Sequence, residues 1–129
     1  MIKTEGVDHI AISVKDIEKS IKWYSEIIGL ERVHADMWDG VPVFIISNGS
    51  GLAIFPADES KEDSGPATEK FDVRHFAFRV DRENFEKAKK LYKEKNLDFT
   101  IDDHGICYSI YTNDPDGYKV ELTTYEIDK

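Results

Sequence analysis

The stretches Asp8-His-Ile-Ala-Ile-Ser-Val14 and Arg74-His-Phe-Ala-Phe-Arg-Val80 are near-copies of one short phrase. Each phrase alternates apolar residues with others, which is the pattern of a β-strand that buries one face. Each also places a histidine, His9 or His75, at its second position. The chain therefore contains an internal repeat, and each copy begins with a strand that carries a histidine.

The repeat continues through a helix in each copy. Apolar residues recur at helical spacing over residues 17–28 and over residues 85–92. Asp16 is a candidate N-cap and Gly29 a candidate stop for the first helix, and Asn96 ends the second. Because equivalent positions stay 66 to 68 residues apart, the two copies match as whole modules.

Three shorter strand-like runs follow each helix, and turn residues separate them. We expect these strands at residues 31–37, 41–47 and 52–55 in the first module, and at 99–102, 106–112 and 118–125 in the second. The predicted fold class is α+β, with two paired βαβββ modules that form a cupped mixed sheet. The chain is expected to be a single domain over residues 1–129, with module one at 5–56, a linker at 57–73 and module two at 74–126.

Composition restricts the functional class. The chain has 129 residues, of which 40% are hydrophobic, and a net charge of −9. An acidic chain without a basic stripe is a poor partner for nucleic acid or for an anionic membrane. No apolar run approaches the ~20 residues of a membrane span, and the N-terminus lacks the apolar core of a signal peptide. We expect a cytoplasmic protein whose single Cys107 is a buried structural thiol.

Strand alternation places three possible ligands on one kind of surface. His9 and His75 fall on the sheet faces turned away from the helices, and so does Glu121, which lies between Val120 and Leu122. Two imidazoles and one carboxylate on separate strands are the ligand set of a facial metal triad with open positions. The alternative is that these are ordinary polar residues on a solvated sheet face. Equivalent histidines in a repeat, with a carboxylate on the matching face, favour the metal site.

Three segments resemble the vicinal oxygen chelate superfamily, which includes glyoxalase I, extradiol dioxygenases, fosfomycin-resistance proteins and bleomycin-resistance proteins. They are the segments at residues 8–30 and 74–80, and Ser-Ile-Tyr-Thr-Asn-Asp-Pro-Asp-Gly-Tyr-Lys-Val-Glu-Leu at residues 109–122. The resemblance covers nearly the whole chain. It implies paired βαβββ modules around a divalent metal, with His9, His75 and Glu121 at ligand positions.

One departure from the family pattern bears on the chemistry. Glyoxalase I-like members carry a fourth ligand, a glutamate, on the last strand of the first module. Aligning the two modules puts Ala53 there, and a shift of two residues puts Phe55 there instead. Neither side chain can bind a metal or move a proton, which argues against glyoxalase I chemistry itself. A substitute for proton transfer would be His34 or Tyr111, the two catalytic candidates of the sequence.

The sequence leads us to expect a divalent-metal enzyme that acts on a small substrate with adjacent oxygens. It would stabilise an oxyanion or enolate in glyoxalase-like lyase, isomerase or addition chemistry. The first alternative is an extradiol-type ring-cleaving dioxygenase, and the second is a non-catalytic binder of the bleomycin-resistance type. A fosfomycin-resistance function ranks lower, because the sequence shows an acidic loop at 100–104 and no basic tail after Glu121. Fe or Mn is the favoured metal, Zn or Ni is the other choice, and a homodimer is expected.

Overall fold

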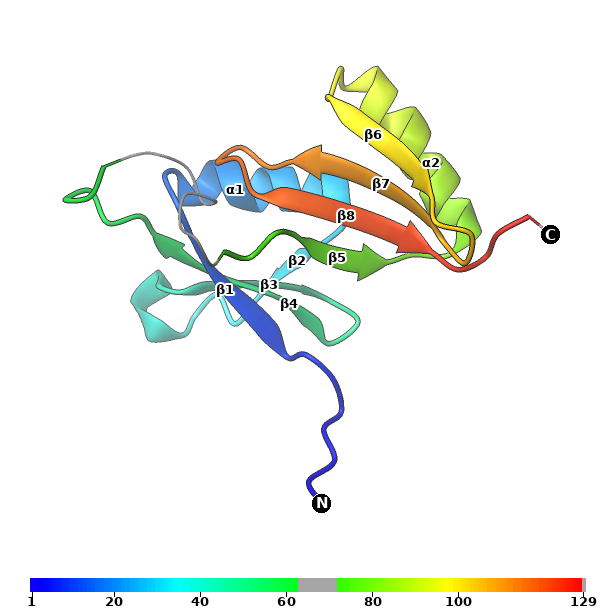
Figure 1. Ribbon diagram of the computed structural model, residues 1–129. Coiled ribbons are helices and arrows are strands. Elements are labelled where there is room, and N and C mark those ends of the chain that lie inside the picture. Colours follow the sequence, from blue (N-terminus) through cyan, green and yellow to red (C-terminus); the bar gives the residue numbers. More distant parts are fainter. Residues whose placement is uncertain (63–71, 129) are drawn as a thin grey trace. The chain divides into compact units, whose positions relative to one another are not determined.

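The computed structural model describes residues 1–62 and 72–128, and the chain forms two compact units, Met1–Glu62 and Asp63–Lys129 (Figure 1). Each unit is described by itself below. Residues 63–71, most of the linker expected at 57–73, lie outside the described residues.

Unit 1 is a βαβββ module. The strands are β1 (His9–Val14), β2 (Glu31–Val33), β3 (Val43–Ser47) and β4 (Ser50–Pro56), in the sheet order β1-β4-β3-β2. β1 pairs with β4 in parallel, and the other pairs are antiparallel. The helix between β1 and β2 starts as α1 (Ile17–Trp23) and continues as a π-helical turn, η1 (Tyr24–Ile28). A short 3₁₀ turn, η2 (Trp38–Gly40), precedes β3.

The ends of the first helix lie where the sequence predicts them. The Asp16 side chain caps the helix by accepting a hydrogen bond from the Lys19 backbone N–H at 3.1 Å. At the other end Gly29 adopts a left-handed φ of 87°, and the Gly29 N–H donates to the Tyr24 carbonyl. The helix packs on the sheet through a core of fully buried side chains, the largest of which are Tyr24, Leu30, Ile45, Leu52, Ile54 and Val14.

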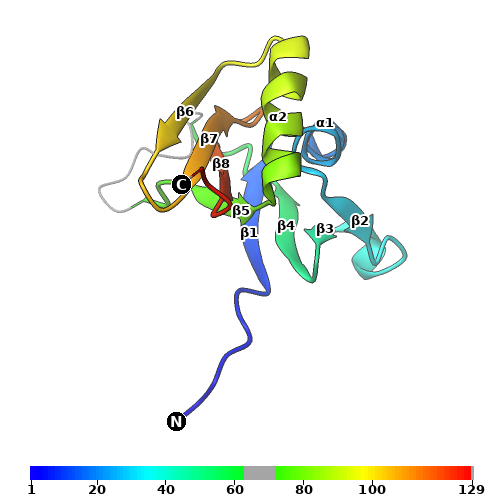
Figure 2. The ribbon, with the colours of Figure 1, turned by 90° about the vertical axis from the view of Figure 1, so that its right-hand side faces the viewer.

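Unit 2 repeats the module. Its strands are β5 (Phe76–Arg79), β6 (Phe99–Asp103), β7 (Tyr108–Asn113) and β8 (Lys119–Thr124), in the order β5-β8-β7-β6. β5 and β8 are parallel and the other pairs antiparallel. Helix α2 (Arg82–Glu94) lies along one face of this sheet (Figure 2). It buries Phe85, Ala88 and Tyr92, and burial raises the pKa of Tyr92 far above its ordinary value.

The expected alternation of faces is confirmed in both units. In β1 the side chains of Ile12 and Val14 are buried, whereas His9 is exposed. In the second phrase Phe76 is buried and His75 is exposed. Cys107 is buried, as expected. The two repeated phrases therefore each hold an apolar face against a helix and leave a histidine on the opposite face.

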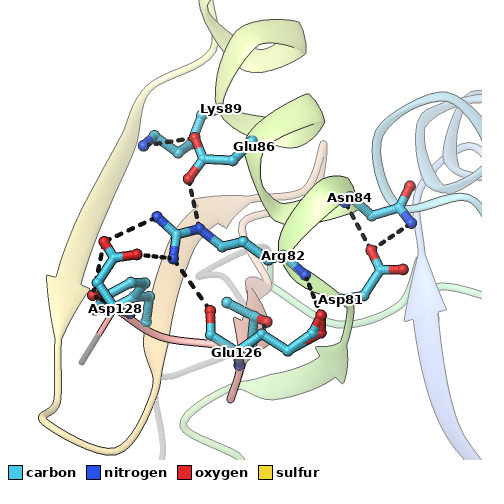
Figure 3. A network of polar contacts seen from close by, with 9 residues as sticks. Asp81, Arg82, Asn84, Glu86, Lys89, Glu126 and Asp128 are labelled. Carbon is cyan, nitrogen blue, oxygen red and sulfur yellow. Dashed lines mark hydrogen bonds and ion pairs between the residues drawn. The ribbon is translucent and has the colours of Figure 1, made fainter.

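The C-terminal segment is tied to the start of α2 (Figure 3). The Arg82 guanidinium donates to the Glu126 carbonyl and to the Asp128 carboxylate, both at 3.2 Å, and to Glu86 at 2.9 Å. The hydrogen bond from Arg82 holds the pKa of Glu86 below its ordinary value. Asp128 also accepts a hydrogen bond from the Tyr108 hydroxyl at 3.5 Å. The segment after β8 is thus anchored to α2 and β7 of its own unit.

One expected strand is much shorter than predicted. The strand expected at residues 31–37 ends at Val33, because His34 adopts a left-handed φ of 55°, which a strand cannot contain. Trp38 and Asp39 are also left-handed, so residues 34–42 form a compact connection instead of an extended one.

Over the described residues, no helix is long and apolar enough to cross a membrane.

Candidate metal centre

His75 and Glu121 form a pair on the face of unit 2 that is turned away from α2. Their side chains come from the residue before β5 and from the centre of β8, and the distance from His75 Nε2 to Glu121 Oε1 is 3.1 Å. Glu121 is buried, and its second oxygen, Oε2, accepts a hydrogen bond from the Ser109 hydroxyl at 2.9 Å. The carboxylate is therefore fixed on one side while its other oxygen meets an imidazole.

Tyr111 lies beside this pair on β7, where it pairs directly with Glu121 across the ladder. Its ring stands edge-on to His75 at 5.7 Å, and its hydroxyl lies 3.1 Å from His104 Nε2. Burial and the hydrogen bond to Glu121 raise the pKa of Tyr111. When the phenol donates to Glu121, His104 donates to the phenol oxygen. Tyr111 is thus held as a neutral proton donor.

Two cationic side chains line a small pocket next to His75. The pocket has a volume of about 170 Å³ and is lined by Val73, Arg74, His75, Phe76, Gly117, Tyr118 and Lys119. The Lys119 ammonium also lies over the Tyr111 ring, 4.7 Å from its centroid. The lining of this pocket therefore includes one arginine and one lysine together with His75.

His9 occupies the matching place in unit 1. Its Nδ1 lies 2.8 Å from an oxygen of Asp8, so the neutral ring carries its proton on Nδ1 and leaves the lone pair on Nε2. Metal-binding histidines are commonly oriented by a carboxylate in this way. Across the ladder His9 pairs with Gly51, which has no side chain to cover the imidazole.

The His75–Glu121 pair offers two donor atoms that are chemically suited to a divalent cation. Metal–donor distances of about 2.1 Å at right angles put neighbouring donor atoms about 3.0 Å apart. The distance of 3.1 Å between His75 Nε2 and Glu121 Oε1 agrees with that spacing. Over residues 1–62 and 72–128, no group of three or more His, Cys, Asp or Glu side chains is placed so that it could hold a metal ion. The roles of His9, His75 and Glu121 as metal ligands stay a prediction.

The pairing registers show that the two modules differ at equivalent positions. In unit 2 Glu121 pairs with Ala77 and Tyr111, and in unit 1 Ala53 pairs with Ala11 and Phe44. Ala53 therefore stands where the second module has Glu121, as the first of the two alignments predicts. Phe44 likewise stands where the second module has Tyr111. Unit 1 has hydrocarbon at the two positions where unit 2 has a carboxylate and a phenol.

The two catalytic candidates of the sequence have different surroundings. Tyr111 is in contact with the His75–Glu121 pair, as described above. His34 follows β2 and contacts the rings of Trp38 and Phe44, at 5.9 and 6.4 Å between ring centroids. Over residues 1–62 and 72–128, the side-chain contacts found for His34 are with these aromatic rings and include no acid that would help it to move a proton. The catalytic roles of both residues stay predictions.

Sequence reasoning missed His104 and Ser109, which contact Tyr111 and Glu121. Ser109 could have been found from strand periodicity, because Ser109 and Tyr111 are two residues apart on the strand that pairs with Glu121. His104 lies in the turn after β6, where strand periodicity gives no signal. Lys119 lies two residues before Glu121 on β8, and the sequence analysis did not consider it as a cation of the site. Arg74 was not considered, because it lies outside the apolar pattern.

A titration tests the state of Tyr111. We expect Tyr111, like the buried Tyr92, to ionise above the ordinary range, because it is partly desolvated and loss of its proton would place a phenolate beside the Glu121 carboxylate. Ultraviolet absorbance of the phenolate, followed from pH 8 to 12, measures this. Comparison with Tyr111→Phe assigns the signal, and Glu121→Gln should lower the pKa of Tyr111. An unchanged Tyr111 pKa in Glu121→Gln would contradict the assigned contact.

Two βαβββ modules, each with a histidine at or next to the start of its first strand, are the arrangement that the resemblance to the vicinal oxygen chelate superfamily implies. The sequence profile of the Glyoxalase/Bleomycin resistance protein/Dioxygenase superfamily matches residues 6–122. The chain belongs to this superfamily, which confirms the family expected from the sequence.

The similar proteins with curated names include thiol transferases. The chain is 32% identical over 128 residues to metallothiol transferase FosB of Staphylococcus haemolyticus, covering 96% of this chain and 85% of that protein. It is 27% identical over 118 residues to glutathione transferase FosA of Serratia marcescens, covering 92% of this chain and 79% of that protein. Among solved structures, a glyoxalase/dioxygenase from Nostoc punctiforme is 26% identical with a TM-score of 0.76, covering 95% of this chain and 92% of that chain.

Two observations bear on the fosfomycin-resistance function, which the sequence ranked low. The sequence ranked a fosfomycin-resistance function low for lack of cationic side chains, yet the structure places Arg74 and Lys119 beside His75. The names FosA and FosB belong to transferases that use thiols.

Proposed function

We propose that this protein is a metal-dependent enzyme that adds a thiol to a small, oxygen-rich anionic substrate. The observation that carries the proposal is the His75–Glu121 pair, with donor atoms 3.1 Å apart and Ser109 holding the second carboxylate oxygen. His9, His75 and Glu121 would hold the divalent cation. When bound, the cation would supply positive charge to an oxygen of the substrate as negative charge develops there.

The surrounding residues supply the other requirements of such a reaction. Arg74 and Lys119 line the pocket beside His75 and would hold an anionic group of the substrate. A thiolate would attack an electrophilic carbon, so that a carbon–sulfur bond forms and a carbon–oxygen bond breaks. The departing oxygen keeps the electron pair and takes a proton from the Tyr111 hydroxyl. The raised pKa of Tyr111 keeps that proton on the phenol until the oxygen becomes basic.

The thiol donor is proposed from the relatives' names, and the substrate from the resemblance of the sequence to fosfomycin-resistance proteins. We therefore propose testing glutathione and cysteine as donors, with fosfomycin, an epoxide that carries a phosphonate, as the acceptor. The protein is stripped with a chelator, reloaded with Mn²⁺, Fe²⁺, Zn²⁺ or Ni²⁺, and assayed for an adduct by mass spectrometry. Adduct formation that needs both metal and protein is the expected result. Turnover that survives chelation would overturn the metal-dependent reaction.

Metal content separates an enzyme of this kind from a binder. We expect one equivalent of divalent metal in the wild-type protein, and much less in His9→Ala and in His75→Ala. His104→Ala is the matched control, because it removes an imidazole of unit 2 that is not a proposed ligand. Elemental analysis of anaerobically purified protein measures this. If the wild-type protein holds no stoichiometric metal and His9→Ala changes neither metal content nor ligand binding, the metal hypothesis fails.

Ring-cleaving dioxygenation is the second candidate, and the contact between His104 and Tyr111 favours it. A catechol must lose protons as it chelates a metal, and a hydrogen-bonded imidazole and phenol next to Glu121 can accept and relay them. Oxygen uptake by the iron-loaded protein with catechol would select this reaction over thiol addition. The homodimer expected from the sequence also stays a proposal, which sedimentation would test.

A further inference from the structure

Arg79 lies on the same face of unit 2 as the His75–Glu121 pair, but farther along β5. The register pairs Ala77 with Glu121, so by alternation Arg79 is the next side chain of β5 on that face. Arg79 therefore stands two residues beyond the level of Glu121, which is about 7 Å along the strand. Arg79 is exposed and is not among the residues that line the pocket beside His75.

The Arg79 guanidinium is stacked on an aromatic ring. Its central carbon lies 4.5 Å from the centroid of the Tyr125 ring, which directly follows β8 and is the diagonal neighbour of Arg79 across the ladder. Tyr125 is itself 49% exposed, so the core does not hold the ring in place. A ring against the face of a guanidinium limits its orientation and leaves the N–H donors at its edge available.

Arg82 shows by contrast how this unit bonds an arginine that has a structural role. Its guanidinium donates to Glu86 at 2.9 Å and to Asp128 at 3.2 Å (Figure 3). Over residues 1–62 and 72–128, the contact found for the Arg79 guanidinium is the Tyr125 ring, and no carboxylate is paired with it. The structure therefore orients Arg79 without neutralising its charge.

The sheet itself explains why no acid reaches Arg79. The transverse row of Arg79 ends in Asp102 on β6, three strands away and so about 14 Å across the sheet. The Glu121 carboxylate, in the adjacent row, already meets His75 and Ser109. A carboxylate that pairs with Arg79 must therefore come from a ligand, if it comes at all.

The surface between the His75–Glu121 pair and Arg79 is low. Ala77 is the side chain of β5 between them, and it is exposed and only a methyl group. A ligand can therefore lie along β5 from the pair to Arg79 without meeting a bulky side chain of this strand. An extended tripeptide spans at most about 10 Å, which covers the about 7 Å between the two levels.

We propose that Arg79, positioned by Tyr125, binds a carboxylate of the thiol donor and so selects thiols that are amino acids or short peptides. This inference rests on the proposed thiol addition. A guanidinium binds a carboxylate through two parallel hydrogen bonds, which a neutral thiol cannot supply. The anionic substrate would bind in the pocket lined by Arg74 and Lys119, near the start of β5, whereas Arg79 lies at its end. The two reactants would thus reach the metal site from opposite ends of this strand.

Binding of S-methylglutathione tests the role of Arg79 without any turnover. This analogue keeps the carboxylates of glutathione, but its methylated sulfur cannot attack a substrate. Calorimetric titration is carried out on the full chain reloaded with Mn²⁺ and again on the chelator-treated chain. Arg79→Gln should weaken binding at least about tenfold, because hydrogen bonds between charged partners are the strong ones. Arg79→Lys should lose less, since lysine keeps the charge without the fork of donors.

Two comparisons show whether the carboxylate and the stack are responsible. The diethyl ester of S-methylglutathione should bind the wild type at least about tenfold more weakly than the diacid, and should bind Arg79→Gln no worse than the wild type. Tyr125→Leu should weaken binding of the diacid, whereas Tyr125→Phe, which keeps the ring, should restore it. Circular dichroism shows whether each variant folds.

Arg32→Gln is the matched control, because it removes an exposed arginine from β2 of unit 1. Its affinity for the diacid should equal that of the wild type, and an equal loss in Arg32→Gln and Arg79→Gln would overturn the proposed site. No binding of the diacid to the wild type, or unchanged affinity in folded Arg79→Gln, would overturn it as well. The adduct assay judges thiol addition separately, so binding that depends on Arg79 in a protein that forms no adduct would support the carboxylate site alone.

Discussion

Replacing Glu121 with glutamine is expected to abolish stoichiometric metal binding, with an affinity loss of at least about 100-fold. Glutamine has nearly the same shape, but it removes the negative charge that offsets part of the cation's charge. Glu121 is buried and lies in the centre of β8, so a cation loses its only anionic donor among the three proposed ligands. Calorimetric titration with Mn²⁺ or Zn²⁺ measures the loss, and enzymatic activity should disappear with it.

Ser109→Ala should weaken metal binding less than Glu121→Gln does. It keeps the carboxylate but removes the hydroxyl that holds Oε2 at 2.9 Å. Loss of a group that orients a ligand typically weakens metal binding about 10- to 100-fold, so this variant should fall between the wild type and Glu121→Gln. Full metal affinity in a folded Glu121→Gln protein would show that Glu121 is not a ligand.

The repeat made most of the fold predictable. Period-two alternation in the phrases at 8–14 and 74–80 defines which face of each first strand is buried, and this holds in both units. Helical spacing and the capping residues Asp16 and Gly29 predicted the first helix, because these signals depend only on local chain geometry. The alignment that put Ala53 at the position of Glu121 is confirmed by the strand registers.

The parts of the structure that could not be predicted depend on backbone conformations that the residue types do not indicate. His34 has no preference strong enough to signal a left-handed φ, so the run at 31–37 resembles a strand in the sequence. The contact between His104 and Tyr111 requires a turn at 104–107 that brings the imidazole back to β7, and the sequence shows only the turn residues. The pocket lined by Arg74, His75 and Lys119 could not be predicted from composition either, because a net charge of −9 does not indicate where individual cationic residues lie.

The two modules share a backbone and have diverged in chemistry. Equivalent ladder positions carry Ala53 and Phe44 in unit 1, and Glu121 and Tyr111 in unit 2. Each repeated phrase keeps its histidine, His9 in unit 1 and His75 in unit 2. The sheet face that carries His75 is polar, whereas the sheet face that carries His9 is aromatic. Equivalent positions of the two sheets therefore carry different chemistry, although the strand pairing is the same.

Gly51→Ala is expected to lower the free energy of unfolding by about 3 kcal/mol, at the upper end of the cost of overpacking. Gly51 lies between His9 and Ile46 in the sheet, and a Cβ there would overlap the Ile45 carbonyl oxygen and lie 2.7 Å from Ile46 Cα. Both atoms belong to the backbone, so β3 and β4 must separate to admit a methyl group. Urea unfolding followed by circular dichroism measures the loss.

Gly49→Ala is the matched control in the preceding turn. Gly49 has a φ of 80° but open space around a Cβ, so its replacement should cost only about 1 kcal/mol of left-handed strain. A larger loss for Gly51→Ala than for Gly49→Ala separates steric overlap from backbone strain. Because His9 pairs with Gly51, the displaced ladder should also weaken metal binding in the folded variant. An unfolding free energy equal to that of the wild type would contradict the close packing of β3 against β4 beneath His9.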